Sequence, residues 1–192
     1  MVKAMLKTGI VPDFIVVDGT EGGTGAAPVE FSNHVGMPMI EGLTFVHNTL
    51  RGAGLRDRVK MGAAGKVVSA FDIARALALG ADWCNSARGF MFAIGCIQAQ
   101  ACHTNHCPVG VATQDPELER RMNVAAGAER VARYLTAMTM EVTSLAKACG
   151  KSSVHNLEPE DLRALSFEAS AFTGVKMAGI DREFDWDTMR KA

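Results

Sequence analysis

The sequence has few aromatic residues and no excess of charge of either sign. One Tyr and two Trp occur among 192 residues, and aromatic residues make up 6% of the chain. Twenty Lys and Arg residues nearly balance 21 Asp and Glu residues, which leaves a formal net charge of −1. This balance offers no basic patch for nucleic acid or for an anionic membrane surface, so we expect neither as a partner.

Long apolar runs are also absent. No stretch approaches the 18 or so uncharged apolar residues that indicate a transmembrane helix. The segment 1–9 is short and amphipathic, and it lacks the apolar centre and cleavage site of a signal peptide. Five cysteines without an export signal predict a cytoplasmic protein, and in a reducing compartment clustered cysteines more often bind metals than form disulfides.

The pattern that is present is that of an α/β protein. A continuous apolar run at 14–17 predicts a strand buried on both faces, and 58–62 and 81–85 predict two more. Helices are expected at about 41–55 and from Ser69, where Ser69-Ala-Phe-Asp72 has the spacing of a capping box. This order of strands, glycine-bearing turns and helices predicts β-α-β units and a parallel sheet.

The second part of the chain has the residue pattern of helices and lacks that of strands. Residues 115–150 predict one or two helices whose apolar positions, including several Met, form a core-facing stripe. A further short helix is expected at 157–162, with Pro159 in its first turn. A helical region therefore follows the α/β region.

Three of the five cysteines form a cluster. Cys96, Cys102 and Cys107 are spaced Cys-x5-Cys-x4-Cys and are followed by Pro. Soft thiolates from one loop suit an iron–sulfur cluster or zinc, and His103 or His106 could complete a tetrahedral zinc site. Zinc sites usually contain tighter cysteine pairs, so the spacing favours iron–sulfur; unliganded buried thiols are the plainest alternative.

The other cysteines and histidines are isolated. Cys84 lies in an expected strand and Cys149 at an expected helix end, so we interpret both as small buried side chains. His34, His47 and His155 each lack neighbours of catalytic type and are interpreted as structural.

Two glycine-containing turns have the features of a phosphate site. Gly62-Ala63-Ala64-Gly65 lies between a strand and a capped helix, where small residues let backbone N–H groups approach an anion. After the next strand, Ala87-Arg88 supplies a fixed positive charge, and Lys66 is a possible auxiliary. Each turn alone could simply close a tight connection, but together they favour phosphate binding.

The loop 18–25 carries two carboxylates among glycines at the carboxyl end of a strand, where α/β enzymes place their chemistry. Asp18 could simply brace the turn. Glu21 is the candidate catalytic residue, expected to face a substrate.

Together these segments resemble the FMN-binding glutamate synthase family, specifically the synthase domain of the glutamate synthase large subunit. The resemblance covers about 3–150 and rests on 18–28, 54–59, 65–69, 76–82 and the cysteine segment 95–115. It implies a (β/α)₈ barrel that holds FMN beside a [3Fe–4S] cluster. It also implies reductive formation of glutamate from 2-oxoglutarate and ammonia through 2-iminoglutarate.

The resemblance assigns roles by position. Cys96, Cys102 and Cys107 correspond to the cluster ligands, and Gly62 to Gly65 with Ala87-Arg88 to the FMN phosphate loops. One departure is that Ala63-Ala64 stands where many relatives have paired glycines. Ammonia is expected from a glutaminase unit and electrons from an NAD(P)H subunit or ferredoxin.

The expected organisation is that of a partial barrel, since 192 residues are few for a closed one. The resemblance implies that residues 1–115 form barrel strands six to eight with the iron–sulfur loop 95–110, and that 116–192 form a helical extension that packs on the barrel. Strands one to five are expected from a longer chain or a partner subunit. Two alternatives stay open: an electron-transfer or scaffold module without turnover, or a synthase that joins another amine to glutamate.

Overall fold

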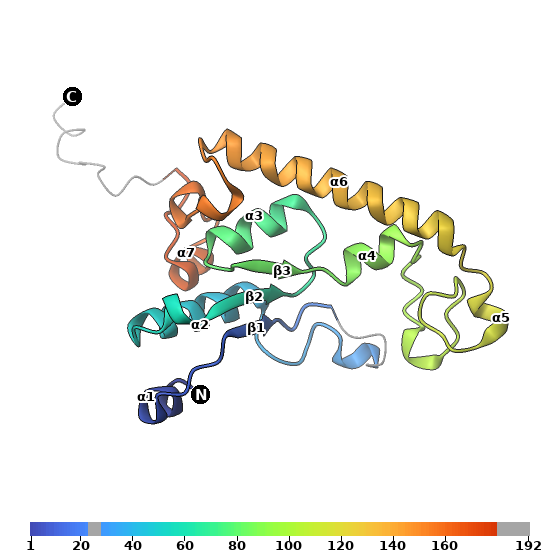
Figure 1. Ribbon diagram of the computed structural model, residues 1–192, viewed down its shortest axis with the longest axis horizontal. Helices are drawn as coiled ribbons and strands as arrows, with labels where there is room; N and C mark the ends of the chain where they lie inside the picture. Colours follow the sequence, from blue (N-terminus) through green and yellow to red (C-terminus); the bar gives the residue numbers. More distant parts are fainter. Residues whose placement is uncertain (23–27, 180–192) are drawn as a thin grey trace.

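A small parallel sheet forms the centre of the molecule (Figure 1). The computed structural model describes residues 1–22 and 28–179. The strands are β1 (Phe14–Asp18), β2 (Lys60–Ala64) and β3 (Trp83–Asn85), in the order β1-β2-β3. Helices α2 (Met39–Gly52) and α3 (Ala70–Ala78) connect them. The predicted β-α-β-α-β order is confirmed, and this mixed α/β arrangement is consistent with part of a barrel.

The remaining helices lie before and after the sheet. α1 (Val2–Thr8) precedes β1, and α4 (Arg88–Ala93) follows β3. The helices expected in 115–150 are α5 (Pro116–Glu119) and α6 (Val124–Ala148), and α7 (Phe167–Thr173) comes last. Five short 3₁₀ helices complete the described elements: Val29–Phe31, Arg56–Arg58, Cys102–Thr104, Val154–Asn156 and Pro159–Asp161. Over the described ranges, no helix combines the length and apolarity needed to cross a membrane.

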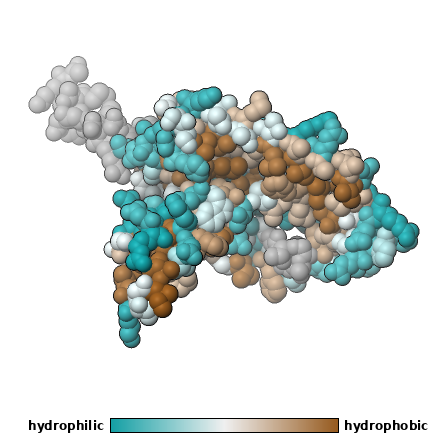
Figure 2. Space-filling view, in the orientation of Figure 1, coloured by the Kyte–Doolittle hydropathy of each residue, from teal (hydrophilic) through white to brown (hydrophobic). Residues whose placement is uncertain are grey.

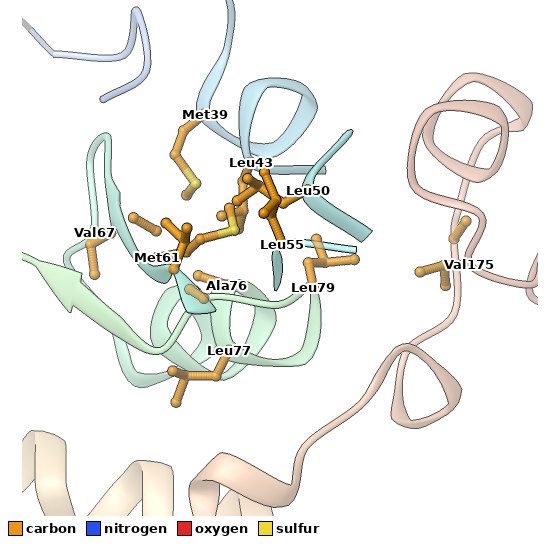
Figure 3. Packing of buried hydrophobic residues seen from close by; sticks show 14 of the residues in the cluster. Met39, Leu43, Leu50, Leu55, Met61, Val67, Ala76, Leu77, Leu79 and Val175 are labelled. Carbon is orange, nitrogen blue, oxygen red and sulfur yellow. The ribbon is translucent and has the colours of Figure 1, made fainter. Parts of the chain in front are cut away.

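The main core lies between the sheet and its two connecting helices. Met61 of β2 and Leu43 and Leu50 of α2 are fully buried, and in Figure 3 they lie close together with Ala76 of α3. Burying one such Leu or Met side chain stabilises a fold by about 1.5–3 kcal/mol. Because these residues come from three consecutive elements, they fix how the strand ends are placed relative to one another.

The opposite face of the sheet is open, which differs from the expectation for β1. Phe14 and Val16 are 58% and 38% exposed, whereas Ile15 and Val17 pack on the core. On the open face, Phe14 packs against Trp83 edge to face, with ring centroids 5.7 Å apart. A strand is buried on both faces only when a second layer covers it, and nothing in residues 1–22 and 28–179 covers this one. β1 and β3 also each pair along one edge only, within the same residues.

The carboxyl-terminal helices that the structure describes pack on the α/β region. Met138 and Val142 of α6 are buried against Ala70 of α3, and α6 runs alongside α3 in Figure 1. Ala146 and Leu157 continue this contact against Ala78. The helical extension therefore holds the helix that follows the β2 loop.

A polar network joins the sheet where β2 and β3 begin. Arg56 donates to the carbonyls of Val59 and Gly80 and to Asp82 Oδ2, at 2.9, 2.7 and 2.9 Å. Its Nε also donates to His47 Nδ1 at 3.2 Å. Burial and the nearby guanidinium of Arg56 lower the pKa of His47. His47 is thus structural, as the sequence suggested.

Candidate functional site

A polar cleft of about 370 Å³ lies beyond the carboxyl ends of the strands. It is formed by the loops after β1, β2 and β3 together with the cysteine segment. Two of its side chains, Lys66 and Arg88, carry a fixed positive charge. The lining residues are Gly22, Ser32, Asn33, His34, Lys66, Val68, Arg88, Phe92, Gln98, Gln100, Cys102 and His103.

Backbone strain is concentrated in this cleft. Among the described residues, five that are not glycine have a positive φ, and four of them line the cleft: Asn33 (68°), Lys66 (51°), Gln98 (56°) and Gln100 (55°). This conformation costs an ordinary L-residue about 1–2 kcal/mol. Such residues persist where the surroundings hold them and are typical of ligand sites.

The predicted phosphate residues divide between the strand and the cleft. Gly62, Ala63 and Ala64 belong to β2, so the loop itself begins at Gly65. Gly65 has a φ of +148°, and a Cβ there would lie 2.7 Å from the Met39 side chain, so only glycine fits. Lys66 lines the cleft. Ala87 caps α4, and Arg88 is its first residue and also lines the cleft.

The loop that follows Gly65 carries free N–H groups, as does the first turn of α3, where the N–H groups of Ala70 and Phe71 have no acceptor among the described residues. In the part of the chain that the structure describes, the N–H groups of Lys66 and Val67 have no acceptor. In contrast, Asp72 Oδ2 accepts the N–H groups of Val68 and Ser69 at 3.2 and 2.9 Å, which completes the predicted capping box. The side chain of Asp72 thus takes up the two N–H groups that precede α3, and phosphate binding at this helix start stays a prediction.

α6 braces the two loops that carry Lys66 and Arg88. The Tyr134 hydroxyl donates to the carbonyl of Val68 at 2.9 Å, and its ring meets Phe90 edge to face. Arg130 donates to the carbonyls of Ala93 and Ile94 at 2.9 and 3.0 Å, at the end of α4. This role of α6 was not predicted from the sequence. The available signal was Tyr134, the single Tyr of the chain, which lies on the core-facing side of a predicted helix.

The three clustered cysteines line one small cavity beside the cleft. Cys96, Cys102 and Cys107 all contribute to its wall, and Cys102 lines the cleft as well. Among the described residues, no three His, Cys, Asp or Glu side chains come close enough together to hold a single metal ion. The thiols therefore surround a shared space but do not meet at a point.

The environments of the five thiols differ. Burial raises the pKa of Cys107, but backbone N–H groups around its sulfur, from Ala112, Val109, Val111 and Gly110, outweigh this and hold that pKa below its ordinary value. Burial raises the pKa of Cys84 to about 11, which suits an inert thiol. Cys149 is exposed, so the expectation that it is buried was wrong: it follows the last turn of α6, on the side turned to solvent.

Glu21 lies at the edge of this region. Both carboxylate oxygens accept the N–H of Met39, at 2.9 and 2.8 Å, so Glu21 caps the start of α2. Asn33 Oδ1 accepts the N–H of Gly22 at 2.7 Å, which ties this turn to the cleft. A substrate-facing role for Glu21 stays a prediction. His34, interpreted as structural from sequence, is exposed and lines the cleft.

Comparisons with known proteins identify the family of this chain. Residues 2–152 match the family model described as a conserved region in glutamate synthase. The glutamate synthase large subunit-like protein YerD of Bacillus subtilis (strain 168) is 47% identical over 149 residues, which cover 78% of this chain and 28% of that protein.

Two further relatives match more of the chain. A glutamate synthase large subunit-like protein of Rhizobium meliloti (strain 1021) is 38% identical, with 87% of this chain and 41% of the relative covered. The archaeal glutamate synthase [NADPH] of Methanocaldococcus jannaschii is also 38% identical, with 87% and 34% covered. The chain thus spans between about a quarter and two fifths of the length of these relatives. It belongs to the glutamate synthase family.

Proposed function

We propose that this chain provides the FMN phosphate site and the iron–sulfur ligands of a cytoplasmic glutamate synthase. The observation that carries this proposal is the shared position of Cys102. It lines the cleft that holds Lys66 and Arg88, and it also lines the cavity that holds Cys96 and Cys107. A phosphate-bearing cofactor and a thiolate-bound cluster would therefore be neighbours.

The residues of the cleft fit a phosphate monoester. Lys66 and Arg88 provide two cations, and charge-assisted hydrogen bonds to phosphate are among the stronger ones in proteins. The N–H groups of Lys66 and Val67 add donors from the loop. The loop, held by α6, can keep these donors in place before the ligand arrives.

The cysteine segment fits a [3Fe–4S] cluster. Three thiols around one space provide one ligand for each iron, and N–H groups that donate to a ligand sulfur tune such clusters. A single zinc ion instead needs its ligands to converge at about 2.0–2.3 Å from one point. The cavity measures about 10 Å³, so the exposed residues 97–100 would move outward to admit the cluster.

The proposed reaction is the reduction of 2-iminoglutarate, formed from 2-oxoglutarate and ammonia, to glutamate. When bound, FMN supplies the hydride and the cluster supplies its electrons. The residues of this chain hold the phosphate and the cluster. Glu21 is our candidate for contact with the substrate, since its bonds to Met39 keep the carboxylate beside Gly65.

Turnover would need further segments. The open sheet face, the two open strand edges in the described residues and the greater length of the relatives support a requirement for strands from a longer chain or a partner subunit. A glutaminase unit would supply ammonia. The electron donor would be an NAD(P)H subunit or a ferredoxin; several relatives are named as glutamate synthases that use NADPH.

The open sheet also favours a second candidate: an electron-transfer or scaffold module that holds the cluster without turnover. A related synthase that joins another amine, such as methylamine, to glutamate is a variant of the first candidate. Assays of the completed enzyme with ammonia, glutamine and methylamine would distinguish these candidates.

Anaerobic reconstitution tests the cofactor assignments. Protein incubated with ferrous iron, sulfide and FMN should show the visible and EPR spectra of a three-iron cluster and should quench FMN fluorescence. The variant Lys66→Ala should bind FMN about tenfold or more weakly, whereas Lys147→Ala, at an exposed position on α6, should bind it unchanged. Stoichiometric zinc without an iron signal would contradict the cluster assignment.

A further inference from the structure

We propose that Cys102 and Gln100 form a common wall between the flavin cleft and the cluster cavity, so that a bound flavin covers Cys102 and closes the cluster off from solvent. Both residues line both spaces. Cys96 and Cys107 line only the cavity. This inference rests on the proposed function and assigns a distinct position to one of three ligands.

The local structure supports this asymmetry. Cys102 is half-buried and begins the 3₁₀ helix Cys102–Thr104, whereas Cys107 is only 7% exposed and surrounded by backbone N–H groups. Gln100 has a φ of 55°, which costs an ordinary residue about 1–2 kcal/mol. The backbone thus turns sharply where the wall separates the two spaces.

The shared wall makes binding in the two sites interdependent. A ligand in the cleft removes solvent from the Cys102 side of the cavity, and solvent exposure is one of the factors that set the properties of an iron–sulfur cluster. Coupling between two binding sites is reciprocal. A bound cluster that holds Cys102 in place should therefore raise the affinity for flavin, and bound flavin should raise the affinity for the cluster by the same factor.

Site-resolved alkylation of the whole chain tests the wall. The anaerobic, cluster-free protein is treated with iodoacetamide with and without FMN, and modification of each cysteine is followed by mass spectrometry. FMN should slow alkylation of Cys102 about tenfold or more. Cys149, which is exposed and lines neither space, serves as the internal control and should react at one rate throughout.

A variant and a binding measurement separate the outcomes. Arg88→Ala should abolish protection of Cys102 at an FMN concentration that protects the unaltered chain. If FMN binds, as judged by quenched fluorescence, but the alkylation rate of Cys102 does not change, the inference of a shared wall is wrong and the proposed function stands. If iodoacetamide does not alkylate Cys102 in the absence of FMN, the inference is also wrong, because Cys102 would then not face the empty cleft. FMN that does not bind would overturn the proposed function and this inference with it.

Discussion

At the scale of single residues, the thiols have distinct surroundings despite identical chemistry. Cys96, Cys102 and Cys107 surround one cavity, whereas Cys84 lies in β3 and Cys149 faces solvent. We expect serine at any of the first three positions to abolish most iron incorporation after reconstitution. Cys149→Ser should leave the iron content unchanged. Iron analysis with EPR checks this, and full iron in all three variants would contradict the ligand assignment.

Arg88 is one of the two cations that line the cleft. It begins α4, and Arg130 and Tyr134 hold that helix in place. Loss of a charged hydrogen bond costs about 1.5–3 kcal/mol, so Arg88→Ala should weaken FMN binding by about tenfold to a hundredfold. Arg120→Ala, in the exposed pair with Glu117, provides the matched control. Fluorescence titration gives both dissociation constants; equal values would remove Arg88 from the site.

At the scale of elements, the start of α3 depends on one carboxylate. Burial raises the pKa of Asp72, but N–H and hydroxyl donors from Ser69 and the N–H of Val68 outweigh this and lower it from its ordinary 3.8. This stabilisation is complete above pH 3.8 and is lost as the pH falls through the lower folded-state value. Asp72→Ala should cost about 1 kcal/mol at pH 7 by urea unfolding.

Unfolding measurements at acidic pH provide the control for Asp72→Ala. Because the variant lacks the carboxylate, the difference in free energy of unfolding between it and the unaltered chain should shrink as the pH falls below 3.8. A difference that stays constant with pH would show that the cost comes from lost packing and not from the capping bonds.

The end of α3 depends on one glycine. Gly80 has a φ of +106°, and a Cβ there would lie 2.1 Å from His47 Nδ1. Gly80→Ala should therefore destabilise the chain by more than the backbone strain of about 1–3 kcal/mol alone. Gly150→Ala carries similar strain at φ +73° but meets no atom within 4 Å. Thermal unfolding of the pair should show the larger loss for Gly80→Ala.

The order of elements was predictable from sequence because each has a local signal. The apolar run at 14–17, the Ser69 to Asp72 spacing and the helical pattern over 115–150 all appear in the structure near their expected positions. The end of β2 was not predictable. Ala63-Ala64 continue the strand because their partners Val17 and Asp18 extend the pairing, which is a non-local contact.

At the scale of the whole molecule, the cleft shows why sites are harder to predict than elements. Lys66, Arg88 and the three cysteines were identified from motifs. Asn33, His34 and Gln98 carry no motif, and they become neighbours only when three strand ends and a long loop are brought together. The open face of the sheet likewise depends on which strands are present, a property of no single segment.

The open sheet predicts self-association of the isolated chain. β1 presents Phe14 and Val16 beside an edge that is unpaired in the described residues, and α1 and the turn after it expose Leu6 and Ile10, where Figure 2 shows apolar surface. We expect association that increases with concentration in analytical ultracentrifugation. Val16→Lys should reduce it, whereas Val124→Lys, on exposed α6, should not. A chain that is monomeric at high concentration would contradict this.

At the residues of the cleft with positive φ angles, stability and ligand binding favour different side chains. Glycine at Gln98 or Gln100 would relieve strain of about 1–2 kcal/mol at each position and so raise the melting temperature. The same change would remove the amide side chains that line the cleft. Directed evolution for heat resistance alone would therefore accumulate substitutions that remove the proposed binding site. If the cleft binds flavin as proposed, a selection that retains flavin binding would leave these costly residues in place.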